Sequence, residues 1–275
     1  MNVAEALEFV SHTHPGMVRA HNEDSLGVVP ELGLAILADG MGGYNAGEVA
    51  SGIAVSLLQA ELRQILEKTD PGEPDSRTGE PAGVPILREH ILRANASVYQ
   101  AAQSQPQYAG MGTTLVVALF CDNRLIVAHI GDSRLYRLRG DVLEQVTKDH
   151  SLLQEQLDGG MISREEARMS QHKNLVTRAL GIDPRVEPEI RSYDVRRDDV
   201  YLLCSDGLND MVPDEEIRLT LMTLQSDLKL AAAQLVQAAN DNGGRDNISV
   251  ILVKVRREFP AERGWMSQLL TWFKK

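Results

Sequence analysis

The sequence predicts an α+β fold in which antiparallel sheets and long helices form separate layers. Runs of β-forming residues are grouped, and four of them lie between Thr113 and Thr147. Long amphipathic helices, such as those expected over 46–67 and 86–102, stand apart from these groups. Strands and helices do not alternate regularly, and no internal repeat is present. Segregated elements of this kind favour layered antiparallel sheets over a parallel βαβ sheet.

The first hundred residues contain short strands followed by two helices. Glycine and proline separate the strands, which we expect at 7–13, 26–29 and 34–38. Apolar residues then recur at helical spacing over 46–67 and again over 86–102. Between the two helices, residues 70–85 contain four prolines and three glycines, which predicts a surface loop.

The remainder of the chain begins with the four β-rich runs, which we interpret as one antiparallel meander. The turns Asp122-Asn123, Gly131-Asp132 and Gly140-Asp141 separate its strands. Residues 149–170 are polar and are expected to be helical in pieces. Further strands are predicted at 186–195, 200–204 and 248–255, and helices at 214–224 and 227–240. One domain over residues 1–256 and a tail over 257–275 are therefore expected.

Composition excludes several classes of protein. The 275 residues carry 28 Lys and Arg against 39 Asp and Glu, and the resulting net charge of −11 disfavours nucleic acid as a partner. The two cysteines, Cys121 and Cys204, lie in apolar runs, which fits a reducing cytoplasm better than a disulfide framework. The beginning of the chain has no secretory pattern, and apolar runs such as 115–121 are too short to span a bilayer.

Four aspartates mark the ends of strongly apolar segments. Asp39 and Asp132 follow predicted strands, Asp206 comes two residues after another, and Asp246 precedes the last one. Neighbouring antiparallel strands begin and end at the same sheet edge, so these carboxylates are able to meet there. Ordinary turn chemistry explains any one of them, but it explains the whole set and the adjacent segment 19–24 less well.

Converging carboxylates repel one another unless cations neutralise them. An all-oxygen ligand set suits Mg²⁺ or Mn²⁺, whereas zinc sites usually contain His and Cys at short spacing. Two such ions about 3.5–4 Å apart are the usual clamp for displacement at phosphorus. The pattern therefore indicates hydrolysis of a phosphate ester.

Competing phosphoryl and hydrolytic chemistries lack their motifs. The sequence has no Walker A loop, no GxSxG elbow, and no arginine six residues after either cysteine. A water activated by metal is therefore the expected nucleophile.

Six motifs occur in an order that resembles a known family. They are RAHNED at 19–24, LADGMGG at 37–43, GMGTT at 110–114, GDSR at 131–134, CSDGL at 204–208 and GGRDN at 243–247. Together they resemble the bacterial form of the metal-dependent protein phosphatases (PPM, or protein phosphatase 2C) over about residues 8–255. The resemblance implies a central antiparallel β-sandwich flanked by pairs of helices, in four layers, with a flap subdomain.

The same resemblance implies a dinuclear Mn²⁺ or Mg²⁺ centre. Asp39 would bridge the two ions, and the carbonyl of Gly40 would be a further ligand. Asp206 and Asp246 would hold one ion, and Glu23 would reach the other through water. These residues are the expected metal ligands.

Other roles carry over from the matching motifs. Arg19 would bind the substrate phosphate in a bidentate manner, and with Asp39 it forms the expected catalytic pair. Asp24 and Asn247 would support the ligands from behind. Asp132 would join Asp206 in a third, weaker metal site.

The activity implied is hydrolysis of phosphoserine and phosphothreonine in proteins, in a bacterial signalling role that opposes a Ser/Thr kinase. The kinase and its substrates are then the expected partners. Two alternatives remain: a catalytically silent phosphoprotein-binding regulator, and a phosphatase of a small phosphate ester. Met41 and Tyr44 stand where family members carry histidines, so no general acid is assigned.

Two further segments have expected roles. Residues 149–180 resemble the flap beside the active site of bacterial members, with a solvated helical insertion as the simpler interpretation. In the tail, both tryptophans fall within 264–275 on a mostly apolar helical face that ends in two lysines. Such a tail either docks on the domain or contacts a partner or a membrane surface.

Overall fold

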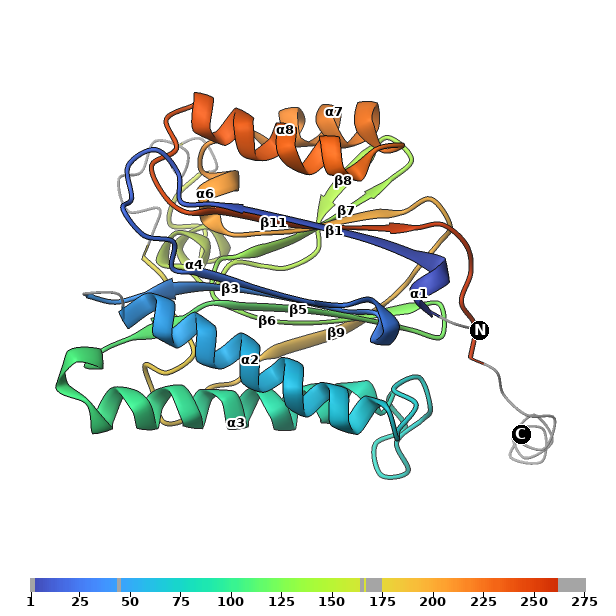
Figure 1. Cartoon of the computed structure of the whole chain (residues 1–275), viewed down its shortest axis with the longest axis horizontal. Helices are drawn as coiled ribbons and strands as arrows, with labels where there is room; N and C mark the ends of the chain where they lie inside the picture. Colours follow the sequence, from blue (N-terminus) through green and yellow to red (C-terminus); the bar gives the residue numbers. More distant parts are fainter. Residues whose placement is uncertain (1–2, 44–45, 164–165, 167–174, 262–275) are drawn as a thin grey trace.

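The computed structural model describes residues 3–43, 46–163, 166 and 175–261. Two antiparallel sheets face each other, and a pair of helices covers the outer side of each (Figure 1). This arrangement confirms the predicted α+β fold and its four layers of helices, sheet, sheet and helices.

The first sheet has five strands, all paired antiparallel. Their spatial order is β1 (Leu7–His14), β11 (Ile248–Val255), β10 (Val200–Cys204), β7 (Arg134–Arg139) and β8 (Val142–Gln145). Helices α7 (Asp214–Leu224) and α8 (Leu228–Asp241) lie over its outer face (Figure 1). β11 is buried along its whole length because it has a strand on each side and apolar layers above and below.

The second sheet is built from strands of the first two thirds of the chain and one later strand. Its order is β2 (Asp24–Val29), β3 (Leu34–Met41), β5 (Leu115–Cys121), β6 (Arg124–Ile130) and β9 (Glu189–Asp194). A short β4 (Gly112–Thr113) pairs with the end of β3. Helices α2 (Ala46–Leu66) and α3 (Gly83–Ser104) cover this sheet from outside (Figure 1).

Three apolar layers hold the sandwich together. β3 shows why its sequence is an unbroken apolar run: Ile36 and Ala38 face α2 and α3, whereas Ala35 and Leu37 face the other sheet. Successive strand residues point to opposite sides, so a strand covered on both sides needs apolar residues at every position. Large side chains of the two sheets meet in the middle layer, where Phe120 and Tyr201 contact each other edge to face.

Shorter elements connect these layers. They are α1 (Val3–Ala6), the 3₁₀ helices η1 (Pro30–Leu32) and η2 (Pro106–Tyr108), α4 (Leu152–Asp158) and α6 (Asp206–Asn209). Ser151 caps α4, since its side-chain oxygen accepts a hydrogen bond from the Gln154 amide at 3.3 Å. α6 begins at Asp206, and only Ser205 separates it from β10, so a candidate ligand lies at a helix start.

The predicted single meander is wrong in one respect. β5 and β6 pair in the second sheet, whereas β7 and β8 pair in the first. The chain crosses between the sheets at Gly131, whose φ of +102° strongly favours glycine. β6 has β5 on one edge and β9 on the other, so no edge remains for β7. The GDSR motif is therefore a crossover and not a hairpin.

Some predicted boundaries also differ. The second long helix begins at Gly83 and not at Ile86, because proline is tolerated in the first helical turn and Pro85 lies there. β9 covers Glu189–Asp194, which is shorter than the strand expected over 186–195. Of the predicted helical segment 149–170, the structure shows α4, while 164–165 and 167–174 lie outside the described residues. The tail over 262–275 lies outside them as well.

No helix in the described part of the chain is both long and apolar enough to cross a membrane.

Candidate active site

Aspartates from both sheets converge on one place in the fold. Two of them flank known element boundaries there, since Asp39 lies near the end of β3, before α2, and Asp206 begins α6; Figure 1 shows these elements at the same end of the sandwich. Asp24 stands directly opposite Asp39 in the pairing of β2 with β3. Asp132 follows β6, Asp206 starts α6 after β10, and Asp246 lies two residues before β11. The two sheets therefore bring together the four strand-end aspartates of the sequence analysis, and Asp24 with them.

Their proximity is seen in the electrostatics. Burial, followed by the charges of Asp24, Asp206, Asp132 and Asp246, raises the pKa of Asp39 well above its ordinary value. Burial and the neighbouring carboxylates raise the pKa of Asp206 in the same way. Charges that repel one another this strongly in one place are costly for the protein unless a cation compensates them.

Two further carboxylates have pKa values raised to about 6. Burial is the main cause for Asp24, even though the Ser205 hydroxyl donates a hydrogen bond of 2.9 Å to its Oδ2. The other oxygen of Asp24 is buried and accepts no hydrogen bond. Burial and then the charge of Asp149 raise the pKa of Asp132, which is 7% exposed. Buried carboxylate oxygens form a donor set that fits Mg²⁺ or Mn²⁺.

The main chain at Asp39 is held by hydroxyl groups. The Thr114 hydroxyl accepts from the Asp39 amide at 3.1 Å, and the Thr113 hydroxyl donates to the Asp39 carbonyl at 2.8 Å. Ser133 Oγ lies 2.7 Å from Thr114 Oγ1, so the turn after β6 supports β3 through this threonine. Asp39 is therefore fixed in position by contacts that span more than seventy residues of sequence.

Gly40 allows a very close approach of three segments in the site. A Cβ there would lie 2.1 Å from the carbonyl oxygen of Gly47 in α2 and 2.6 Å from that of Glu23. The Gly40 amide donates to this same Glu23 oxygen at 3.1 Å. β3, β2 and the start of α2 can thus pack this tightly only because residue 40 has no side chain.

Asn247 connects three segments of the site. Its side-chain nitrogen, Nδ2, donates to the backbone carbonyls of Pro15 and His21 at 3.0 and 2.9 Å. Its side-chain oxygen, Oδ1, accepts from the backbone amide of Glu23 at 2.7 Å. The backbone amide of Asn247 donates to Asp246 Oδ1 at 2.9 Å. These bonds hold the loop between β1 and β2 against the start of β11.

Arg19 lies at the rim of the acidic cluster. Its Nη2 is 2.7 Å from Asp246 Oδ2, and the two side chains are 53% and 32% exposed. The hydrogen bond to Asp246 and the charge of this carboxylate raise the pKa of Arg19. A half-exposed guanidinium beside the cluster remains accessible to an anion from solvent.

A protein-family model, described as protein phosphatase 2C, matches residues 11–252 of the sequence. The chain belongs to the protein phosphatase 2C family. The serine/threonine phosphatase stp of Listeria innocua is 38% identical over 245 residues, which are 88% of this chain and 93% of that protein.

Solved structures of similar sequence have the same fold. The crystal structure of the Mycobacterium tuberculosis serine/threonine phosphatase PstP/Ppp has a TM-score of 0.80 and 37% identity, over 91% of this chain and 99% of that one. A crystal structure of the PstP catalytic domain in complex with two manganese ions has a TM-score of 0.78, with the same identity and coverage. These comparisons confirm the family that the six motifs indicated.

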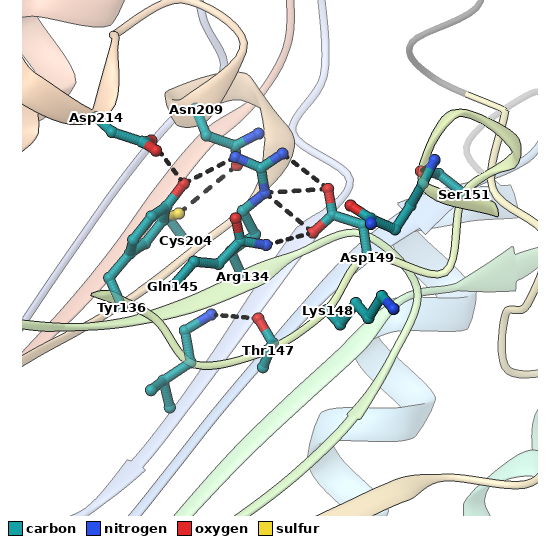
Figure 2. Close-up of polar contacts among 12 residues, drawn as sticks. Arg134, Tyr136, Gln145, Thr147, Lys148, Asp149, Ser151, Cys204, Asn209 and Asp214 are labelled. Atoms are coloured by element: carbon teal, nitrogen blue, oxygen red, sulfur yellow. Dashed lines mark hydrogen bonds and ion pairs between the residues drawn. The ribbon is translucent and has the colours of Figure 1, made fainter. Parts of the chain in front are cut away.

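Sequence reasoning assigned no role to three charged residues near this phosphatase 2C site. Arg134 donates to Asp149, and the two are the centre of a partly buried polar network (Figure 2). The charge of Asp210 contributes to the raised pKa values of Asp132 and Asp206. The GDSR motif contained the available signal for Arg134, but its partner is fifteen residues away in the chain and no local pattern specifies it.

A second group of possible metal ligands lies next to the turn that carries Asp132. His129, His150 and Glu189 bring one ligand atom each within 4.8 Å of one another, and the two imidazoles stack with centroids 4.7 Å apart. The Gly131 amide, however, donates to His150 Nδ1 at 3.2 Å, which places the ring hydrogen of neutral His150 on Nε2. A metal on Nε2 would require a hydrogen on Nδ1, so this trio fits a neutral histidine pair better than a metal site.

The positions that depart from the family pattern are only partly described. Met41, the last residue of β3, is half-buried and pairs with Gly112 of β4. Tyr44 lies outside the described residues. Among described residues of the segment 149–180, Leu180 exchanges two backbone hydrogen bonds with Thr113, next to the site.

Proposed function

We propose that this member of the protein phosphatase 2C family hydrolyses phosphoserine and phosphothreonine in proteins. The observation that carries the proposal is the convergence of Asp24, Asp39, Asp132, Asp206 and Asp246 from two sheets on one point. A cluster of buried carboxylates with raised pKa values destabilises a metal-free protein, and metal binding repays that penalty.

Four carboxylates have a proposed place around two divalent cations, Mn²⁺ or Mg²⁺. Asp39 would bridge them with the Gly40 carbonyl beside it, Asp206 and Asp246 would hold one ion, and Glu23 would reach the other through water. The support for this assignment is that the backbones of Asp39 and Glu23 are tied down by hydrogen bonds, as a preorganised ligand set requires.

Three further residues have supporting roles in the proposal. Asp24 lies behind Asp39, and Asn247 connects Glu23 with Asp246 through its side chain and its amide. Asp132 would join Asp206 at a third, weaker metal site. Burial of Asp132 supports this, because an isolated carboxylate rarely remains in such a place without a partner.

The cations, when bound, would lower the pKa of a coordinated water and stabilise charge on the phosphoryl group. Arg19 would leave its ion pair with Asp246 and bind two phosphate oxygens of the substrate, thereby orienting phosphorus over the cluster. Lysine cannot form this bidentate contact. No residue is assigned as general acid.

Other parts of the proposal concern context. Residues 1–256 would form the phosphatase domain, with 149–180 as a flap beside the site and 257–275 as a tail that contacts a partner or a membrane surface. In the cytoplasm the enzyme would oppose a Ser/Thr kinase, and the kinase and its phosphorylated substrates would be its partners. Phosphorylated kinase offered to the purified enzyme tests this role.

The test is hydrolysis of a phosphothreonine peptide by the purified chain with Mn²⁺, with EDTA, and after Asp39→Asn. Turnover should require both the metal and Asp39. Asp227→Asn is the matched control, because Asp227 caps α8 away from the cluster and Asn caps a helix equally well. Bound Mn²⁺ without turnover would instead support the silent phosphoprotein-binding regulator, and turnover of small esters alone would support a metabolite phosphatase.

A further inference from the structure

Arg134 is the first residue of β7 and its side chain is locked in one place. Its Nε lies 3.0 and 3.1 Å from the two carboxylate oxygens of Asp149, and its Nη2 lies 2.7 Å from Oδ2 (Figure 2). Its Nη1 donates to the Tyr136 hydroxyl at 2.8 Å, and this hydroxyl donates to Asp214 of α7 at 3.0 Å. The guanidinium therefore has a defined partner on every side.

Asp149 is fixed as firmly as Arg134. Gln145 Nε2 donates to its Oδ1 at 2.8 Å, in addition to the bonds from the guanidinium. The side chains of Arg134 and Asp149 are 22% and 11% exposed, so solvent screens the pair only weakly.

The ion pair also closes a loop around the turn that carries Asp132. On one side of the turn, Gly131 donates to His150 Nδ1 at 3.2 Å and accepts from the His150 amide at 2.9 Å. On the other side, Arg134 holds Asp149. Only Asp132 and Ser133 lie between these two anchors, so the anchors set the position of both.

The two enclosed residues lead directly to the acidic cluster. Asp132 is one of the charges that raise the pKa values of Asp39 and Asp206. Ser133 bonds to the Thr114 hydroxyl, which accepts from the Asp39 amide. A displacement of the turn would thus move a proposed ligand and would loosen the support of the bridging one.

We propose that Arg134 and Asp149 are a positioning pair that fixes the 131–133 turn, so that Asp132 faces the cluster and Ser133 supports Asp39 through Thr114. The inference rests on the proposed phosphatase function. Neither residue of the pair touches substrate or metal; both act through the turn.

The same strand offers a matched control. At the far end of β7, Arg139 makes a bidentate pair with Asp199 at 2.8 and 2.7 Å, and Asp199 is 1% exposed. In this second pair the carboxylate is more buried and the arginine is slightly more exposed, at 27% against 22% for Arg134, but the pair joins β7 to the start of β10, away from the cluster. Loss of either pair should lower stability, and only loss of the first should change metal binding.

The experiment compares Arg134→Gln, Arg134→Lys and Asp149→Asn with Arg139→Gln. Mn²⁺ binding is measured by electron paramagnetic resonance of the free ion, and turnover of p-nitrophenyl phosphate is measured as a function of Mn²⁺. Changes to the partners of metal ligands typically weaken metal affinity or activity about 10–100-fold. We expect Arg134→Gln and Asp149→Asn to weaken Mn²⁺ binding about tenfold, and Arg134→Lys to lie between them and the unaltered chain because lysine lacks the fork. Arg139→Gln should bind Mn²⁺ as the unaltered chain does.

Two results would overturn the inference. One is Mn²⁺ binding and kcat within twofold of the unaltered chain in folded Asp149→Asn, a variant that keeps the shape of the pair and replaces Arg134→Gln if that one does not fold. The other is an equal loss of binding in Arg139→Gln, which would indicate a general effect of stability. Mn²⁺ binding is measured without substrate, so it does not depend on the proposed function. A chain that binds Mn²⁺ but hydrolyses no phosphate ester would refute the proposed function, and comparison of Mn²⁺ binding among the four variants would still decide the role of the pair.

Discussion

Replacement of Asp132 by asparagine should stabilise the metal-free protein. Asp132 is 7% exposed, and burial, with added repulsion from Asp149 and Asp210, raises its pKa to about 6. The guanidinium of Arg134 offsets this repulsion only in part. Asparagine has the same shape without the charge, so the penalty for burying a carboxylate disappears.

The magnitude follows from the change in pKa on folding. The unfolded value is 3.8 and the folded value is about 6. Since one unit corresponds to about 1.4 kcal/mol, ionised Asp132 costs roughly 3 kcal/mol above pH 6. Each kcal/mol shifts the melting temperature of a protein of this size by about 2–4 °C, so Asp132→Asn should melt about 6–12 °C higher in EDTA.

The gain should depend on pH with a definite sign. A carboxyl whose pKa is higher in the folded state binds more protons there, so stability falls as pH rises from 3.8 to about 6. The gain from asparagine should therefore be complete at pH 8, decline through this window and vanish below it. Thermal and urea unfolding in EDTA at intervals between pH 4 and pH 8 measure it.

Asp199→Asn is the control, because Asp199 is equally buried but paired with Arg139. Removal of one partner of a buried pair typically costs about 3–5 kcal/mol, so this variant should lose stability at pH 8. A destabilised Asp132→Asn at pH 8 in EDTA, or a gain that persists at pH 4, would refute the reasoning. With excess Mn²⁺ the advantage of Asp132→Asn should shrink, because the unaltered chain gains more from the metal.

Three other expectations concern single positions. Gly40→Ala should lower the melting temperature strongly and turnover by a large factor, because its Cβ would lie 2.1 Å from a carbonyl oxygen. Gly52→Ala is its control: with open space at its Cβ, it should stabilise α2 by about 1 kcal/mol. Arg19→Lys should lower kcat/KM for a phosphopeptide about tenfold or more with Mn²⁺ binding unchanged, and equal kinetics would contradict the bidentate role. Burial lowers the pKa of His150 to about 4. The free energy of unfolding that depends on neutral His150 is therefore complete above pH 6.5 and should be lost as pH falls toward 4. His150→Gln should flatten the dependence of unfolding free energy on pH over this range.

Much of the fold was predictable because local patterns report burial. Alternation and apolar runs located β3, β5, β10 and β11 to within a few residues, since each strand faces apolar layers. The same patterns do not say which strand lies beside which. The crossover at Gly131 was therefore interpreted as a hairpin turn, although the φ of this glycine serves a change of sheet.

The candidate site shows the same division. The aspartates at strand ends were recognisable because carboxylates next to apolar strands are chemically unusual, and the six motifs around them indicated the family. The partners that hold them were not recognisable. Asn247 bonds to Glu23, 224 residues away in the chain, and Thr114 bonds to Asp39 across 75 residues. No spacing rule connects residues at such distances.

The sequence by itself determined the α+β class, the positions of most strands and helices, the acidic donor set and the phosphatase 2C family, because each is encoded in local periodicity or in short motifs. Tertiary structure alone decided how the strands divide between two sheets, which backbones fix Asp39, and that Arg134 pairs with Asp149 beside the cluster. The physical reason is that a buried polar group is satisfied by whatever the fold brings within about 3 Å, and separation along the chain places almost no limit on that partner.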